Sequence, residues 1–268
     1  MDDPGHLERR SASFPHRGSR HGSPASSHGS GLHEAEARGS GPGVITPDGC
    51  SVELYALLPP MGEPEIVHAA VPAGASILEL GTGAGRVTHP LVGLGHPVVA
   101  VDESPEMLAH IRGAETVRAP IQGLDLGRRF DAVLLASHMV NTDDDRLRRQ
   151  FLEACRRHLN DGGCVLLQRH QPAWFEEAAE GERTSGEVTF RLRDLRRPAP
   201  GLLAATVEYQ VGDRVWTQWF TARRLDDAEL ADVLAQAGLV VDAYLTGDGS
   251  WVRAVPASRG RALGRSPR

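Results

Sequence analysis

Apolar and polar residues follow two different patterns along this chain, and the change falls near residue 171. From residue 76 to residue 170, short apolar runs alternate with stretches of helical periodicity. The run 130–137 is apolar almost throughout, which is typical of a strand buried on both faces. Such alternation predicts a parallel sheet with helices on both faces. The expected strands are 76–80, 97–101, 130–137 and 164–169, and the expected helices are 52–58, 64–70, 85–94, one opening at 104–106, and 144–159, with a turn at 161–163.

After residue 171 the apolar positions recur every second residue. The stretches 187–195, 202–211 and 214–222 predict an antiparallel β-meander. A capped helix at 226–237 and two strands, 239–245 and 251–255, then return to the main sheet. The predicted fold is α/β: a Rossmann-like, doubly wound, mostly parallel sheet with the meander inserted between strands 5 and 6.

The two ends of the chain lack this patterning. Residues 1–43 hold eight glycines, eight serines and four prolines with few large apolar side chains, so we expect a disordered tail. Residues 256–268 carry four arginines and no acid, which predicts a short, disordered basic tail. One domain is expected over 44–255, with its antiparallel cap at about 185–222.

Charge and cysteine content narrow the class of protein. The 268 residues carry a net charge of -6, and 44–255 hold 20 arginines against 30 acidic residues, which argues against a nucleic-acid partner. No apolar run is long enough to cross a bilayer, so no membrane partner is expected. Cys50, Cys155 and Cys164 form neither a disulfide framework nor a metal-ligand spacing. We therefore expect a reduced, cytoplasmic protein without a metal.

A glycine loop follows the first strand of the predicted sheet. Gly81, Gly83 and Gly85 allow a ligand to approach the backbone at the start of a helix. Asp102 ends the second strand, at the position that reaches ribose hydroxyls in doubly wound sheets. The dinucleotide fingerprint needs a glycine where Arg86 stands. A ligand with a ribose and no phosphates is therefore favoured over a pyrophosphate.

Four segments in order carry a family resemblance: 79–86 (ELGTGAGR), 101–108 (VDESPEML), 130–138 (FDAVLLASH) and 158–163 (HLNDGG). Together they resemble the motifs of class I S-adenosylmethionine-dependent methyltransferases, over roughly residues 50–170. A lone glycine loop is weak support, whereas four motifs at the right intervals are specific. The resemblance implies S-adenosylmethionine as cofactor and S-adenosylhomocysteine as product, and it leaves the acceptor open.

The resemblance also implies roles for residues at the cofactor. Glu79 orients the amino group, Asp102 holds the ribose diol, and Met107 flanks the adenine. The family usually places an acid against the adenine amino group, but 119–122 has no carboxylate, so backbone near Ile121 and the Gln122 side chain are the candidates. The complete predicted cofactor set is Tyr55 (in an N-terminal lid), Glu79, Gly81, Thr82, Gly83, Gly85, Asp102, Glu103, Met107, Ile121, Gln122 and Ser137.

Methyl transfer from a sulfonium mainly requires alignment of the acceptor, with a base only where the acceptor is protonated. Acceptor residues are expected where strands 4 and 5 end. His138 is a candidate base or orienting group, or it shapes the loop by bonding to backbone. Asn141 orients a substrate group or, as we favour, caps the following helix.

Two further candidates end the fifth strand. Arg169 offers a bidentate site for a substrate carboxylate, and His170 is a second candidate base. Each is equally readable as a solvated strand-end residue. Because the chain has no lysine, base chemistry falls to His138, His170 or a carboxylate.

Aromatic residues concentrate in the predicted meander. Trp216 and Phe220 share one face of a strand and Trp219 lies on the other, so they form a small core, the walls of an acceptor pocket, or both. Methyltransferases that tailor small metabolites or peptides often carry such an insertion. We therefore predict methyl transfer to N or O of a small-molecule or peptidic metabolite. The alternatives are a macromolecular (RNA or protein) methyltransferase and a non-methylating S-adenosylmethionine-binding protein; the oligomeric state stays open.

Overall fold

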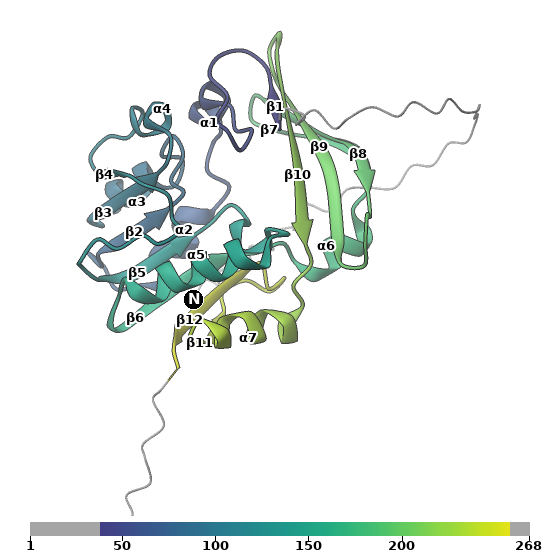
Figure 1. Ribbon diagram of the computed structural model, residues 1–268. Helices are drawn as coiled ribbons and strands as arrows, with labels where there is room; N and C mark the ends of the chain where they lie inside the picture. The colour runs from purple at the N-terminus through teal and green to yellow at the C-terminus, as the bar shows by residue number, and fades with distance from the viewer. Residues whose placement is uncertain (1–37, 258–268) are drawn as a thin grey trace, which may run out of the picture.

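The computed structural model describes residues 38–257, so most of the predicted N-terminal tail and nearly all of the C-terminal one lie outside the described residues. Figure 1 shows two sheets: a large one flanked by helices and, to one side of it, a smaller one. Among residues 38–257, no helix has the length and apolar character needed to cross a membrane.

The larger sheet has seven strands. All neighbouring pairs from β4 to β6 are parallel, whereas β12 runs antiparallel to both β6 and β11. This confirms the predicted mostly parallel, doubly wound sheet, including the return of the last two strands. In spatial order the strands are β4 (Glu115–Arg118), β3 (Val98–Asp102), β2 (Ile77–Leu80), β5 (Phe130–Leu135), β6 (Leu159–Gln168), β12 (Trp251–Pro256) and β11 (Leu239–Tyr244).

Helices cover both faces of this sheet and bury separate apolar cores. On one face, α5 and α7 contribute Phe151, Leu152 and Leu230 to the core. On the other, Val67 of α2 and Leu91 of α3 pack on the strands. The helices are α1 (Val52–Leu57), α2 (Glu63–Ala70), α3 (Thr88–Gly93), α4 (Pro105–Leu108), α5 (Asp145–Arg157), α6 (Pro172–Glu177) and α7 (Asp227–Gln236), with a 3-10 turn η1 (Met139–Asn141).

The smaller sheet, called here the cap sheet, has five antiparallel strands. Three of them match the predicted meander closely. Trp216 is buried and Trp219 exposed, which confirms the predicted division of that strand into two faces. In spatial order the strands are β1 (Gly39–Ser40), β10 (Arg214–Arg223), β9 (Leu202–Val211), β8 (Val188–Arg196) and β7 (Gly181–Ser185).

Several elements differ from the sequence prediction. Strand β4 was not expected, because Val117 is its only large apolar residue, as suits a sheet edge. Residues 161–163 do not form a turn between helix and strand; they bulge out of β6, which pairs Leu159 with Phe130 and Cys164 with Ala132. Residues 38–43, assigned to the tail, are described and contribute β1, which has no apolar side chain and forms only through its pairing with β10.

Candidate active site

The glycine loop lies where β2 ends and is fixed by its own backbone. The N–H groups of Gly81 and Thr82 both donate to the Val101 carbonyl, at 2.9 and 3.0 Å. The φ angles of Gly81, Gly83 and Gly85 are positive, at 70°, 57° and 93°. Residues other than glycine rarely adopt such values. A Cβ placed on Gly81 would lie 2.7 Å from the sulfur of Met139. The loop therefore leaves space that only glycine keeps open.

Asp102 anchors this loop from the end of β3. Its Oδ2 accepts the Gly83 N–H at 2.8 Å and its Oδ1 accepts the Ser104 N–H at 2.9 Å. A carboxylate has about four lone-pair positions, so acceptor capacity remains on each oxygen for the two hydroxyls of a ribose. Neighbouring Glu103 is exposed.

Glu79 is buried beneath the loop, with only 3% of its surface exposed. Its Oε2 accepts a hydrogen bond of 2.6 Å from the Thr88 hydroxyl, which also contacts the Thr82 hydroxyl. Burial raises the pKa of Glu79 to about 7, while the Thr88 bond and the nearby Arg86 act in the opposite direction. An added cation, such as an ammonium group, would favour the charged form.

Helix α1, called the lid here, packs on the glycine loop. Val52 packs with Ala84 and Met107, and Tyr55 borders the same cluster. The Tyr55 hydroxyl donates to Gln218 Oε1 of the cap sheet at 3.1 Å. The lid is thus connected both to the loop and to the cap sheet.

The predicted adenine side contains an unsatisfied acceptor. Gln122 Oε1 is buried and accepts no hydrogen bond from any residue between 38 and 257. Ile121 is buried beside it, 3.9 Å from the position of a Cβ on Gly81. A buried carbonyl without a donor is costly, so this group suits a ligand that brings an N–H, as the amino group of adenine does.

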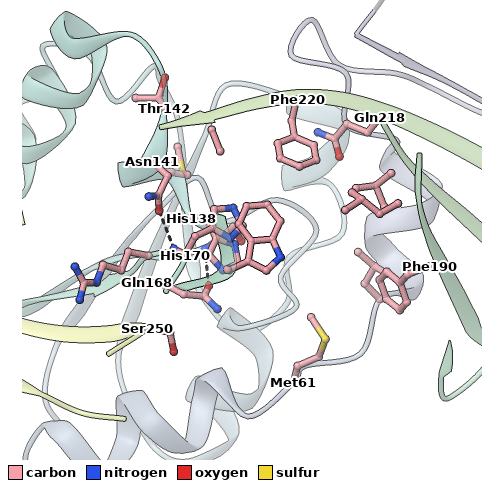
Figure 2. A pocket seen from close by; sticks show the side chains of 18 of the residues that line it. Met61, His138, Asn141, Thr142, Gln168, His170, Phe190, Gln218, Phe220 and Ser250 are labelled. Atoms are coloured by element: carbon pink, nitrogen blue, oxygen red, sulfur yellow. Dashed lines mark hydrogen bonds between the residues drawn. The ribbon is translucent and has the colours of Figure 1, made fainter. Parts of the chain in front are cut away.

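A cavity of about 750 Å³ lies between the cap sheet and the carboxyl ends of β5 and β6. Figure 2 shows His138, His170 and Gln168 together, with Phe190, Gln218 and Phe220 across from them. The cavity therefore has one wall from the main sheet and one from the cap sheet, with Tyr55 and Met61 from the N-terminal region.

Three aromatic rings stack along the main-sheet wall. The ring centroids of His138 and His170 lie 3.9 Å apart, with an angle of 5° between the ring planes. The ring centroids of His170 and Trp174 lie 4.2 Å apart, with an interplanar angle of 12°. Burial, and to a smaller extent the positive charge of Arg86, lowers the pKa of His138 to about 4. Burial, and to a smaller extent the neighbouring His138, lowers the pKa of His170 well below its usual range. Both imidazoles are therefore neutral at pH 7.

Backbone strain places His138 at this wall. Ser137 and His138 have φ values of 54° and 59°, in the left-handed region that residues other than glycine rarely adopt. The Ser137 N–H donates to Gln168 Oε1 at 2.7 Å, which ties the two strand ends together. Within the described part of the chain, neither ring nitrogen of His138 forms a hydrogen bond, so the alternative role of a backbone contact is not observed and both nitrogens are available to a ligand.

Arg86, the residue that breaks the dinucleotide fingerprint, also lines the cavity. It forms an ion pair with Glu63, whose side chain is 3% exposed, and lies 3.4 Å from the Ser137 hydroxyl. A buried carboxylate is stable only when paired. This ion pair is a polar part of the cavity lining, beside His138.

The contacts of Arg169 do not support its predicted role in carboxylate binding. Its guanidinium donates to the Gly249 and Leu225 carbonyls at 2.8 and 3.0 Å and to Asp227 Oδ1 at 2.5 Å. The side chain is 2% exposed. These contacts connect β6 to α7 and the loop before β12, which is a structural role.

Asn141 does not cap α5, so that prediction is wrong; Asp144 does, by accepting the N–H groups of Arg146 and Leu147. The buried Asn141 amide instead accepts the His170 N–H and donates to the Arg223 carbonyl, both at 2.8 Å. It therefore connects the ends of β5, β6 and β10.

Sequence reasoning missed three polar residues of this region: Glu63, Gln168 and Gln218. Gln218 lies on the same face of β10 as Trp216 and Phe220, because the three residues are spaced two apart. A polar residue between two aromatic residues of this face could have indicated that Gln218 belongs to the site. Glu63 and Gln168 had no comparable signal, because their partners are distant in sequence.

Comparisons with known proteins agree with this geometry. Residues 77–163 match the family model described as a methyltransferase domain. An uncharacterized methyltransferase of Mycobacterium tuberculosis is 31% identical over 188 residues, 67% of this chain and 73% of that protein. A ubiquinone biosynthesis O-methyltransferase of Xanthomonas oryzae is 29% identical over 187 residues, 62% of this chain and 76% of that one.

A solved structure, the sugar N-methyltransferase KedS8 from Streptoalloteichus, shares the fold. The match between the two structures has a TM-score of 0.58 and 20% sequence identity, and it covers 89% of this chain and 99% of KedS8.

The fold and these relatives define a methyltransferase. The chain belongs to the methyltransferases. A solved structure of the same fold, the glycopeptide N-methyltransferase MtfA, contains S-adenosylmethionine; its TM-score is 0.54 at 23% identity, and the match covers 74% of this chain and 87% of that one.

Proposed function

We propose that this enzyme transfers a methyl group from S-adenosylmethionine to a nitrogen or oxygen of a small-molecule or peptidic metabolite. The cavity of about 750 Å³ carries the proposal. Its volume lies within the roughly 300–1,000 Å³ of small-molecule sites. The cap sheet forms one wall of it, and residues 44–255 are acidic in sum, which disfavours an RNA substrate.

Residues at the ends of β2 and β3 fit the cofactor. Bound S-adenosylmethionine supplies a methyl group on a positively charged sulfur. The Gly81–Gly85 loop would lie along the methionine and ribose, Asp102 would accept the ribose hydroxyls, and Glu79 would hold the amino group. The unsatisfied oxygen of Gln122 would accept the adenine N–H, beside Ile121. Met107 and Tyr55 would cover this side from α4 and the lid.

The histidine stack would orient the acceptor. A neutral imidazole can accept a hydrogen bond from an acceptor N–H or O–H and so direct the acceptor's lone pair toward the methyl group. Its low pKa makes His138 a weak base, because base catalysis is most efficient when the pKa is near the working pH. A neutral amine acceptor, which attacks through its lone pair and loses its proton to solvent after methyl transfer, therefore suits this site better than an alcohol.

The test is to incubate the enzyme with methyl-labelled S-adenosylmethionine and an extract of its source organism, and then to identify the labelled compound. Label in a compound of low molecular mass is the expected result. Label in RNA or in a large protein would contradict the substrate class. Cofactor binding without any labelled product would favour a non-methylating protein.

A further inference from the structure

The cap sheet places an arginine without an acidic partner on the cavity wall. Arg183 of β7 lines the cavity, and within residues 38–257 its guanidinium has neither an ion pair nor a hydrogen bond. Three other arginines that line the cavity have acidic partners: Arg86 pairs with Glu63, Arg169 with Asp227, and Arg191 with Glu182 and Glu208.

Arg183 is held in place by a cross-strand row of aromatic residues. Arg183 is paired with Phe190, Phe190 with Tyr209, and Tyr209 with Trp216. Residues directly opposite one another in a sheet share a face, and Phe190 and Trp216 are buried, so the row faces inward. The guanidinium carbon lies 4.4 Å from the Phe190 ring centre, a cation–π contact.

Tyr209 adds a second donor to the same wall. Its ring meets that of Phe190 edge-on at 5.4 Å. Burial raises the pKa of Tyr209 well above its usual range, against the attraction of Arg183 and Arg86. The hydroxyl therefore stays protonated, and no residue in the described ranges hydrogen-bonds to it. The row thus presents a guanidinium and a phenol, both of which donate.

We propose that Arg183 and Tyr209 bind an oxyanion, a carboxylate or a phosphate group, of the acceptor. This inference rests on the proposed function, since it specifies the substrate class as acidic metabolites. The guanidinium fork matches either oxyanion. Phe190 lies across the cavity from His170 in Figure 2, so the acid would be held at one wall while the nucleophile lies beside the histidines of the other.

Calorimetric titration with simple probes tests the site directly. With S-adenosylhomocysteine present to fill the cofactor site, benzoate and phenyl phosphate are titrated into the full-length protein, with benzyl alcohol as the neutral probe. We expect at least one anion to bind about 10-fold or more tightly than benzyl alcohol. The tighter anion identifies the oxyanion. Equal affinity of all three probes would overturn the proposal.

Variants assign the binding to this wall. R183Q should weaken the binding of the anion by about 10–100-fold, and Y209F, which removes only a hydroxyl, by several-fold. The matched control is R193Q, which removes the same charge from the exposed face of β8. Equal loss in R183Q and R193Q would contradict the site, and Y209F provides an independent result if R183Q does not fold.

Labelled transfer separates this proposal from the proposed function. The source extract is divided by anion exchange at pH 7, and each fraction is incubated with the enzyme and methyl-labelled cofactor. We expect the label in the retained, anionic fraction, with R183Q transferring at least 10-fold less and R193Q unchanged. Label confined to the unretained fraction overturns the oxyanion site. No label in any fraction contradicts methyl transfer, and the titrations then decide the oxyanion site alone.

Discussion

The two halves of this enzyme that we propose hold the cofactor and the acceptor are built in different ways. On the cofactor side, backbone determines the shape: glycine φ values, N–H groups of the loop and the Asp102 carboxylate that accepts one of them. On the acceptor side, side chains determine it: the stack of His138, His170 and Trp174 faces the aromatic row of the cap sheet. A backbone site suits a ligand that never changes, whereas a side-chain site can be altered residue by residue without loss of the fold.

The two halves meet at a few polar contacts. The Tyr55 hydroxyl joins the lid to Gln218 of the cap sheet, and Asn141 joins the ends of β5 and β6 to β10. Both contacts are hydrogen bonds between segments far apart in the chain. These residues therefore connect the lid and the main sheet to the cap sheet.

The largest effect is expected from Asp102→Ala. It removes the predicted ribose contact and the acceptor for the Gly83 N–H, so affinity for S-adenosylmethionine should fall at least about 100-fold. Asp161→Ala, an exposed acid at the opposite edge of the sheet, is the control and should bind normally. Calorimetric titration measures both; unchanged affinity in the Asp102 variant would remove the cofactor assignment.

The pH dependence of stability should have opposite signs in the two halves. The folded-state pKa of His138 is depressed to about 4, so the unfolded chain binds more protons between pH 6.5 and 4, and stability falls as the solution is acidified. The folded-state pKa of Glu79 is raised to about 7, so its contribution is full below pH 4.5 and is lost as the pH rises toward and through 7.

Urea unfolding at pH 4.5–7.5 measures these slopes. Each group should contribute on the order of 2 kcal/mol across its window. His138→Gln should flatten the acid side of the profile, and Glu79→Gln should flatten the decline toward neutral pH. Identical profiles for both variants and the wild type would contradict the burial of these groups.

A smaller effect is expected from Gly81→Ala. Both Gly81 and Gly74 have φ near +70°, but a Cβ at Gly74 meets nothing within 4 Å, whereas at Gly81 it meets the Met139 sulfur. Both alanine variants should lose about 1 kcal/mol of stability to backbone strain. We expect only the Gly81 variant to lose cofactor affinity, about 10-fold, because the loop and Met139 must shift. Equal affinities would mean that the loop is not at the cofactor.

The smallest effect should follow Tyr55→Phe. The ring stays over Gly83, but the bond to Gln218 is lost, so the lid should open more easily and the cofactor should dissociate a few-fold faster. Stopped-flow displacement measures this rate. Tyr244→Phe, on the exposed side of β11, is the control and should not change it.

Sequence reasoning was most successful in placing residues together where the segments that hold them follow one another in the chain. Gly81 and Asp102 lie 21 residues apart, and successive parallel strands must bring such positions to one sheet edge. The outcome differs for Arg169, whose partners Leu225, Asp227 and Gly249 are more than 50 residues away. Its position at a strand end indicated a ligand site, whereas its side-chain direction depends on α7.

The sequence by itself determined the class of fold, the cofactor motif and the existence of an antiparallel cap, because strand periodicity and glycine loops are short-range properties. Only the tertiary structure decided which face of the cap closes the cavity and that His138 and His170 stack. It also decided that Arg183 stands among Phe190 and Tyr209 without an acidic partner in the described residues. The histidine stack depends on the pairing of β5 with β6, and the row that contains Arg183 depends on the pairing of β7, β8 and β9. The cavity between them exists only after both sheets have packed together.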